Sequence, residues 1–388
     1  MLRFLTAGES HGPALVVTVE GLPAGLPILV DGVATELARR RLGYGRGPRM
    51  RFERDELEIL GGVRHGRTLG SPVAIVIRNS EWATGTWADE MSAAPGTTAN
   101  PLTQPRPGHA DLAGMQKYGF DDARDVLERA SARETAARVA AGALAKALLE
   151  QIGVSLLSHV VQLGDAVASS EARPGPGDLA RVDESEVRCF DPAAEADMIR
   201  AIKEAAKAGD SLGGVVEVLG YGLPPGLGSH VHWDRRLDGL LAQALMSIQA
   251  MKAVEIGEGF TVAGVRGSEA HDAISWDAGA QVYRRESARA GGIEGGMTTG
   301  DLLVARVAMK PLATLNRPVL KTVDVATKQE TVSFKERTDV TAVPAAGVVA
   351  ETMTALVLAS EALRKFGGDS VSEFTRNHDA YVASLRDR

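Results

Sequence analysis

Two histidines in glycine-rich turns are the side chains best suited to acid–base chemistry. His11 lies in GESHG (residues 8–12), and His109 lies in RPGHADL (residues 106–112). Imidazole gains and loses a proton near neutral pH, and flanking glycines let the backbone come close to a ligand. Taken alone, either histidine is more typical of a plain turn residue. If both line one anion pocket, they supply two positioned acid–base groups.

Arginine is concentrated in the first third of the chain. Residues 1–138 contain 16 Arg and one Lys, whereas the remainder contains 17 Arg and nine Lys. A guanidinium binds carboxylate or phosphate through two hydrogen bonds at once, so this bias predicts a pocket for anions. The stretch RRRLGYGRGPR (residues 39–49) places several arginines on one glycine-containing segment. The alternatives are a codon-driven arginine bias and a solvated basic helix end.

The segment RASARETA (residues 129–136) combines small and basic residues near a predicted helix start. Small side chains at 130–132 allow a flat ring or a phosphate to approach, and amides at a helix N-terminus favour anions. A salt-bridged surface turn is the alternative, because Asp125–Arg129 and Glu134–Arg138 both have the i,i+4 spacing.

The segment GGIEGGMTTG (residues 291–300) contains five glycines ahead of a predicted strand. It predicts either a tight loop that approaches a ligand or a merely flexible loop. It lacks the Gly-Lys-Ser/Thr ending of a P-loop, and no helix follows it as in a dinucleotide-binding turn. Asp339, in RTD (residues 337–339), is equally well explained as a turn or capping residue.

Long apolar helices and short strands alternate along the chain. The segments 126–152 and 344–366 are apolar on nearly all sides, which indicates burial between other layers. Residues 79–107 lack periodicity and are predicted as a long loop. Further helices are predicted at 33–41 (with Asp31 as N-cap), 194–209 and 234–251, and strands at 14–21, 57–63, 73–78, 154–164, 214–221 and 303–309.

Composition excludes several classes of protein. The 388 residues are 44% hydrophobic and 24% charged, as in ordinary globular proteins. The single cysteine, Cys189, excludes a disulfide framework and a multi-cysteine metal site, and it fits a reducing compartment. No apolar run approaches the roughly 20 residues of a membrane span, and the N-terminus is too polar for a signal peptide. The net charge of −7 disfavours nucleic-acid binding. We therefore expect one domain over residues 1–388, located in the cytoplasm, with no metal, membrane or nucleic-acid partner.

Together, seven motifs resemble those of the chorismate synthase family, in the family's order. They cover nearly the whole chain, and seven motifs in order are very hard to obtain by chance. Phe190 is a departure, since a proline is expected there. The motifs are GESHG at 8–12, RPGHADL at 106–112, RASARETA at 129–136, QAMKAVEIG at 249–257, GGIEGGMTTG at 291–300, KPLAT at 310–314 and RTD at 337–339.

The resemblance implies a fold and a reaction. The expected fold is α+β, a β–α–β sandwich with long helices between two antiparallel sheets, assembled as a homotetramer. The expected reaction converts 5-enolpyruvylshikimate 3-phosphate to chorismate and phosphate by 1,4-elimination. It requires reduced FMN and involves no net redox change. NADPH is a candidate external source of reducing equivalents, through a separate flavin reductase.

The resemblance also implies site residues. His11 is expected to protonate the leaving phosphate, His109 to protonate the reduced flavin or hold its charge, and Asp339 to relay a proton near flavin N5. Ser10 and Ser131 are expected to be their hydrogen-bond partners. FMN contacts are expected from Arg129, Ala130, Ser131, Gln249, Ala250, Gly295, Lys310, Pro311, Leu312, Ala313, Thr314 and Arg337. Contacts to the substrate, or to NADP at the substrate–flavin boundary, are expected from Arg40, Arg46, Arg49 and Arg133.

Two other functions compete with this one. A flavin reductase using NADPH is the first, but the chain lacks a recognisable dinucleotide fingerprint. An anion- or RNA-binding protein built on the arginine-rich third is the second. The net negative charge and the 17 aromatic residues, few of them beside basic clusters, disfavour it.

Overall fold

Four antiparallel strands form the first sheet of the computed structural model, which describes residues 2–46, 55–83, 85, 87–98, 100–334 and 339–387. The strand order is β1-β2-β6-β3. Alternation along β2 and β6 buries one face of each strand, with Val17 on β2 and Ile75 on β6 fully inaccessible. The bounds are β1 Arg3–Ala7, β2 Ala14–Glu20, β6 Val73–Arg78 and β3 Glu56–Gly61.

Five antiparallel strands form the second sheet, in the order β10-β15-β9-β7-β8. Its two central partners, β9 and β15, are paired along the whole of β15, from Gly214–Met309 to Gly220–Leu303. The predicted strands at 214–221 and 303–309 are confirmed residue for residue. The bounds are β10 Met251–Ile256, β15 Leu303–Met309, β9 Gly214–Tyr221, β7 Ser155–Leu163 and β8 Ala166–Val167.

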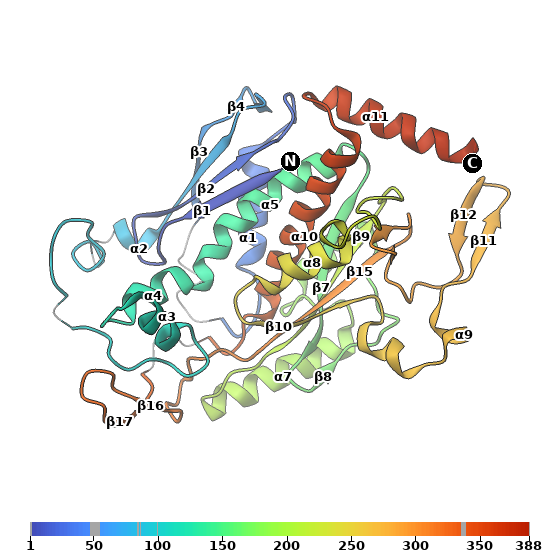
Figure 1. Cartoon of the computed structure of the whole chain (residues 1–388). Coiled ribbons are helices and arrows are strands. Elements are labelled where there is room, and N and C mark those ends of the chain that lie inside the picture. Colours follow the sequence, from blue (N-terminus) through green and yellow to red (C-terminus); the bar gives the residue numbers. More distant parts are fainter. Residues whose placement is uncertain are drawn as a thin grey trace.

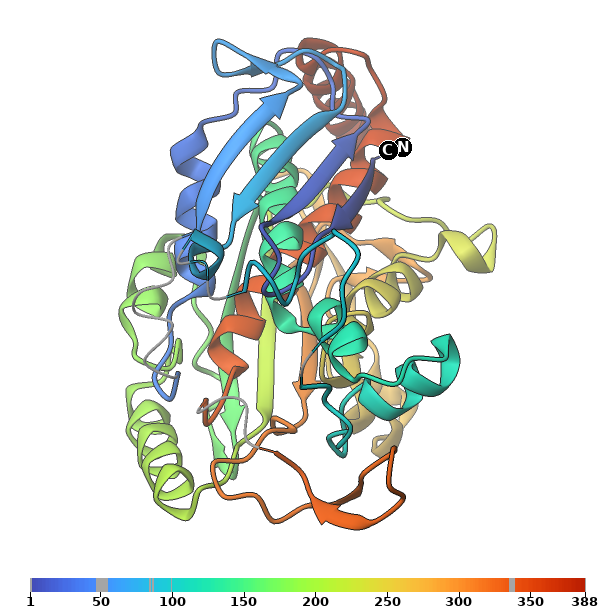
Figure 2. The same ribbon diagram turned by 90° about the vertical axis from the view of Figure 1, so that its left-hand side faces the viewer.

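A layer of long helices lies between the two sheets. Figures 1 and 2 show α5 and α10 running between the blue strands of the first sheet and the green and orange strands of the second. The two helices touch at Gly142 of α5, where a Cβ atom would lie 2.3 Å from the Cβ of Thr352. The predicted β–α–β sandwich is confirmed. The main helices of this layer are α1 Val30–Arg40, α5 Thr135–Glu150, α8 Leu237–Met246 and α10 Val343–Phe366.

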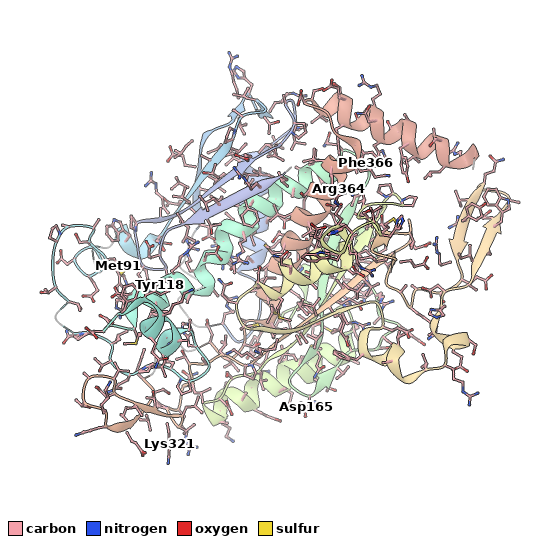
Figure 3. The ribbon with its side chains drawn as sticks, viewed as in Figure 1. Met91, Tyr118, Asp165, Lys321, Arg364 and Phe366 are labelled. Atoms are coloured by element: carbon pink, nitrogen blue, oxygen red, sulfur yellow. The ribbon has the colours of Figure 1, made fainter. Side chains whose placement is uncertain are left out.

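Shorter elements surround this sandwich. The last helix, α11, packs against the end of α10, which carries Phe366 (labelled in Figure 3). The Phe366 ring meets the rings of Phe374 and His378 edge-on. The remaining helices and strands are β4 Val63–Arg64, β5 Arg67–Thr68, α2 Ser80–Ala83, α3 Asp111–Tyr118, α4 Arg124–Ala130, α6 Leu179–Glu184, α7 Pro192–Ala208, α9 Gly267–Ala270, β11 Ile274–Asp277, β12 Val282–Arg285, β13 Ile293–Glu294, β14 Met297–Thr298, β16 Lys321–Val323, β17 Glu330–Val332 and α11 Val371–Ser384.

The prediction of one continuous helix over residues 126–152 is wrong. The chain forms α4, leaves helical geometry at Ser131, makes a single 3-10 turn at Ala132–Glu134 and then continues as α5. Ser131 has ψ 141°, an extended value. Local propensity alone does not predict this break, because the alanine-rich sequence on both sides favours helix.

Several other boundaries also differ from expectation. The helix expected over 234–251 is shorter, because α8 ends at Met246 and Met251 already starts β10. The first helix begins at Val30, so Asp31 lies in its first turn and is not its N-cap. Within the expected loop at 79–107, the structure has the four-residue helix α2.

The helix α10 is long and apolar enough to cross a membrane, so the expectation that no apolar run reaches that length is wrong. Its 24 residues are almost entirely buried between the sheets and the neighbouring helices. The helix is therefore a core element of the sandwich, and its hydropathy reflects burial on all sides.

A buried charge network joins the helix layer. Glu351 of α10 accepts hydrogen bonds from Arg39 of α1 (Nη1–Oε1 2.7 Å) and from Lys146 of α5 (Nζ–Oε1 2.6 Å). Ser158 of β7 donates to its other oxygen at 2.9 Å. Burial alone would raise the pKa of Glu351, but the charges of Lys146 and Arg39 outweigh it and hold that pKa well below its usual range. The network thus fixes three helices and one strand to each other.

We expect Glu351→Ala to lower the free energy of unfolding by about 3–5 kcal/mol, because it leaves two buried cations without their shared carboxylate. Denaturant unfolding at pH 7 measures this change. Glu361→Gln on the same helix is the matched control. It removes an ion pair with the half-exposed Arg364. We expect this loss to lower the free energy of unfolding by about 1 kcal/mol or less. Equal effects of the two substitutions would contradict a structural role for the network.

Candidate active site

Segments far apart in the sequence line one cavity of about 430 Å³. They are the loop after β1, the end of α1, the turn before α3, the junction of α4 with α5, the turn before β10, the segment after β15 and the residues before α10. A volume of this size is typical of sites for small molecules and cofactors. The cavity therefore brings together six of the seven motifs singled out in the sequence.

The walls of the cavity combine two kinds of side chain. Small or apolar residues such as Leu127, Ala130 and Ala250 offer surfaces on which a flat ring can lie. Basic residues in the same walls suit ligands with several anionic groups. They are Arg40, Arg46, Arg106, Arg133 and Lys310.

His11 is bound to a buried carboxylate from α4. Its Nδ1 lies 2.9 Å from both carboxylate oxygens of Glu128, and its backbone N–H donates to Oε2 of Glu128 at 2.9 Å. Burial alone would raise the pKa of Glu128, but hydrogen bonds and charge from His11, together with the Arg124 guanidinium, outweigh it and lower that pKa. The Trp87 ring lies 4.1 Å from the imidazole, centroid to centroid. The imidazole is therefore held at one nitrogen and on one ring face.

His109 also contacts a buried carboxylate through Nδ1, that of Asp111. Arg106 binds the same carboxylate with two hydrogen bonds, Nε–Oδ2 at 2.8 Å and Nη2–Oδ1 at 3.1 Å. Burial opposes ionisation of Asp111, but the hydrogen bonds from His109 and Arg106 hold its pKa well below its usual range. The turn that carries His109 is thus closed by an ionised group.

Arg133 lines the cavity although only 5% of it is exposed. Its Nε donates to Oδ1 of Asn79 at 2.9 Å, and its Nη1 is paired with Asp55. Asp55 also lies 3.8 Å from Nη2 of Arg40. One buried carboxylate therefore sets the positions of two arginines that face the ligand space.

The helix break at Ser131 supplies part of the wall. Ser131 Oγ donates to Ser10 Oγ at 3.2 Å and accepts from the Arg133 backbone N–H at 3.3 Å. The extended residue thereby links the loop after β1 to the start of α5. It also exposes the small side chains of Ala130 and Ala132 to the cavity.

Gln249 contributes a buried acceptor at the cavity wall. Its Nε2 donates to Glu134 Oε2 at 3.1 Å. Its Oε1 is buried and has no hydrogen-bond partner within the part of the chain that the structure describes. Ala250 follows with φ 67°, a left-handed conformation that is uncommon for a residue with a Cβ. A bound ligand with an N–H or O–H group would satisfy the Gln249 carbonyl.

Most residues expected to form the site lie around this one cavity. The expected site residues that line it are Ser10, His11, Arg40, Arg46, His109, Ala130, Ser131, Arg133, Gln249, Ala250, Lys310, Pro311, Leu312, Ala313, Thr314 and Asp339. Asp339 is not a helix cap, since the residue in the N-cap position of α10 is Ala342. Arg49 and Arg337 lie outside the described residues.

Two expected residues do not line the cavity. Arg129 donates to the backbone oxygens of Gly8 and Thr6, both at 3.0 Å, so it holds the loop that carries His11. Gly295 lies in the turn between β13 and β14, with φ 58°.

Sequence reasoning missed several cavity residues and all of the carboxylates that hold the site in place. Arg106 could have been identified as a site residue from the sequence, because it lies in the same motif as His109. Glu128 has no such indication, because 117 residues separate it from His11. The other cavity residues that were not expected are Ala110, Leu127, Met309 and Ala342, whereas Gly108 and Ala132 lie in segments where close approach of a ligand was expected.

Known proteins resemble this chain over its full length. The family model described as chorismate synthase matches residues 2–363. A chorismate synthase of Thermobifida fusca (strain YX) is 60% identical over 395 residues, covering 99% of each chain. One of Streptomyces coelicolor is 60% identical over 393 residues, covering 99% of this chain and 98% of the relative. A solved structure titled "Crystal Structure of Chorismate Synthase" is 42% identical with a TM-score of 0.79, covering 100% of this chain and 99% of the other.

We expect Arg106→Ala to destabilise the protein by about 3 kcal/mol at pH 7, because the buried Asp111 carboxylate loses its guanidinium partner. The carboxylate, whose pKa is lowered in the folded state, contributes stability above the ordinary value of 3.8 and loses it as the pH falls. The difference between the two proteins should therefore shrink between pH 5 and pH 3. Unfolding curves across this range measure it.

Arg78→Ala is the control for this measurement, because the ion pair that it removes, with Glu58, is exposed. It should change stability by about 1 kcal/mol or less at every pH. A cost for Arg106→Ala that stays constant as the pH falls would contradict the assignment of that cost to Asp111.

Proposed function

The chain belongs to the chorismate synthase family, and we propose that the 430 Å³ cavity around His11 and His109 is its active site. The family converts 5-enolpyruvylshikimate 3-phosphate to chorismate and phosphate in the shikimate pathway of aromatic amino acid biosynthesis. The chain is therefore a carbon–oxygen lyase acting on a phosphate ester, and the family requires reduced FMN. The observation that carries the proposal is that two histidines, each bound to a buried carboxylate, lie in one basic cavity.

The charge of the cavity suits this substrate. The substrate carries two carboxylates and a phosphate, and FMN adds a second phosphate. We propose that Arg40, Arg46, Arg49 and Arg133 bind the substrate, or NADP at its boundary with the flavin. Arg40 and Arg133 support the proposal because Asp55 holds both guanidiniums beside the cavity. Preset guanidiniums reduce the entropy lost on binding an anion.

The residues of the cavity fit a flavin. Ala130, Ala250 and the apolar side chains nearby suit a flat ring, and the buried Oε1 of Gln249 can accept from one of its N–H groups. When bound, reduced FMN supplies the electron density that eases the loss of phosphate without net oxidation. We propose FMN contacts from Arg129, Ala130, Ser131, Gln249, Ala250, Gly295, Lys310, Pro311, Leu312, Ala313, Thr314 and Arg337.

The proton-transfer roles fall to the chain's own side chains. We propose that His11 donates a proton to the leaving phosphate, with Ser10 beside it. With the flavin bound, His109 would protonate it or hold its charge, and Asp339 would relay a proton near flavin N5. Ser131 links the junction of α4 with α5 to the loop after β1 through its 3.2 Å hydrogen bond to Ser10.

The setting of the enzyme is also a proposal. We propose a cytoplasmic protein that forms one catalytic domain over residues 1–388 and assembles as a homotetramer, with no membrane, nucleic-acid or metal partner. The domain proposal is supported by the continuous apolar core that joins both sheets. Assembly is supported by the projecting β11–β12 hairpin (Figure 1), on which Trp276 and Tyr283 are exposed.

We expect His11→Ala and His109→Ala each to reduce turnover about 100-fold or more while FMN stays bound, because each removes a positioned acid–base group. Anaerobic assays of phosphate and chorismate release, with FMN binding measured by fluorescence, test this. Near-wild-type turnover in either variant would show that the acid–base role assigned to that histidine is wrong.

We propose that the flavin is reduced externally, by a separate flavin reductase that draws on NADPH. We expect product from the wild-type enzyme with dithionite-reduced FMN, and none with oxidised FMN and NADPH alone. Anaerobic turnover in the two mixtures measures this directly. Product in both would reveal an intrinsic flavin reductase and overturn the proposal of an external one.

A further inference from the structure

We propose that Glu128 is a positioning residue for the reaction: it keeps a hydrogen on Nδ1 of His11, so that Nε2 is the nitrogen that gains and donates the transferable proton. The inference rests on the proposed role of His11 as proton donor to the leaving phosphate. It concerns a residue that lies outside the family motifs quoted above and does not line the cavity itself.

The geometry leaves the imidazole one arrangement at Nδ1. Both oxygens of Glu128 lie 2.9 Å from Nδ1, and an ionised carboxylate can only accept. Nδ1 must therefore carry a hydrogen whether His11 is charged or neutral. Free imidazole has no such constraint, and the hydrogen bond at one ring nitrogen decides which tautomer is present.

Glu128 also fixes where the ring lies. Its side chain accepts from the His11 backbone N–H at 2.9 Å, and its backbone oxygen accepts from the Ser10 N–H at 3.0 Å. One residue of α4 thus holds two consecutive residues of the loop after β1 through backbone and side chain together. His11 and Glu128 are both nearly inaccessible, at 4% and 2% exposed, so water cannot replace these contacts easily.

The charged groups that the structure places around His11 come from two helices, α4 and α2. Glu128 of α4 faces Nδ1, and Arg124 of the same helix pairs with Glu128 at 2.9 Å while lying over the Trp87 ring. Glu81 of α2 faces Nε2 at 3.8 Å, with its side chain one-third exposed. Two carboxylates thus flank the imidazole, one on the side of each ring nitrogen.

The proton transfer balances with this arrangement. The Nε2–H bond of the imidazolium breaks, an O–H bond forms on the leaving phosphate, and the N–H electron pair stays on Nε2. The ring is left neutral with its hydrogen on Nδ1, which Glu128 still accepts. Nδ1 keeps its hydrogen throughout, so Glu128 holds the imidazole in the same way before and after the proton transfer.

The test compares the wild-type enzyme with the near-isosteric variant Glu128→Gln. 15N NMR of histidine-labelled protein at alkaline pH should show neutral His11 as Nδ1–H in the wild type, and a shift toward Nε2–H in the variant, whose amide N–H₂ can donate to Nδ1. We expect kcat to fall about 10- to 100-fold, with the alkaline limb of its pH profile moved to lower pH. KM and FMN affinity should stay within about threefold. Glu128→Asp, which keeps the charge, should recover part of kcat and most of the wild-type pH profile.

Glu217→Gln is the matched control. Glu217 is another buried carboxylate in contact with a histidine, His159 Nε2 at 3.3 Å, but it lies in the second sheet and does not line the cavity. This substitution should leave the His11 tautomer, kcat and the pH profile unchanged. A comparable loss of kcat in Glu217→Gln would assign the effect of Glu128→Gln to general destabilisation and overturn the proposal.

Two further outcomes separate this inference from the proposed function. In the first, Glu128→Gln keeps the wild-type kcat and pH profile while His11→Ala is inactive. This outcome would overturn the role of Glu128 and leave His11 as the acid. An active His11→Ala would overturn the proposed role of His11 as the acid, on which this inference rests. The tautomer of neutral His11 can be measured in the wild-type protein alone. A neutral His11 with its hydrogen on Nε2 would overturn the inference even if Glu128→Gln failed to fold.

Discussion

Buried carboxylates decide where the cationic side chains of this protein lie. An unpaired charge inside a fold is costly, so each buried carboxylate must be matched by a cation or a set of donors. Glu351 binds Arg39 and Lys146 and thereby joins three helices of the central layer. Arg40, the next residue along α1, lines the cavity. The network that holds the core together is therefore adjacent in sequence to a residue that lines the cavity.

The same principle operates around the cavity. Asp55, Asp111 and Glu128 each bind cavity residues from behind, and each is inaccessible or nearly so. Ligand-facing groups on flexible loops become fixed when a buried partner holds their far side. The net acidic charge of the chain is thus compatible with a basic cavity, because part of the acidic charge is used inside the fold to hold arginines and histidines in place.

Local patterns predicted the layers of the fold well. The strands at 14–21 and 73–78 and the helix at 344–366 follow from periodicity within each segment, which does not depend on distant residues. The break at Ser131 does depend on them, because an extended residue there is stabilised by its hydrogen bond to Ser10, more than 100 residues earlier. The end of α8 was missed for a similar reason, since Met251 pairs with Met309 of a strand that comes much later in the chain.

The site could be predicted in its motifs but not in its supports. His11, His109 and the segment at 310–314 stand out because glycines, histidines and basic residues cluster in short stretches. Glu128 does not stand out, since the spacing between it and His11 has no regularity that local structure imposes. Arg106 and Asp111 lie within one motif, yet only the fold shows that they share a hydrogen-bond network with His109.

A crystal structure of this chain with oxidised FMN and 5-enolpyruvylshikimate 3-phosphate would test most directly whether the cavity around His11 and His109 is the active site. We expect both ligands in the cavity, with the flavin ring against Ala130 and Ala250 and the substrate phosphate within hydrogen-bond distance of His11 Nε2. Density for either ligand elsewhere, for instance on the outer face of the second sheet with the cavity filled only by water, would contradict it.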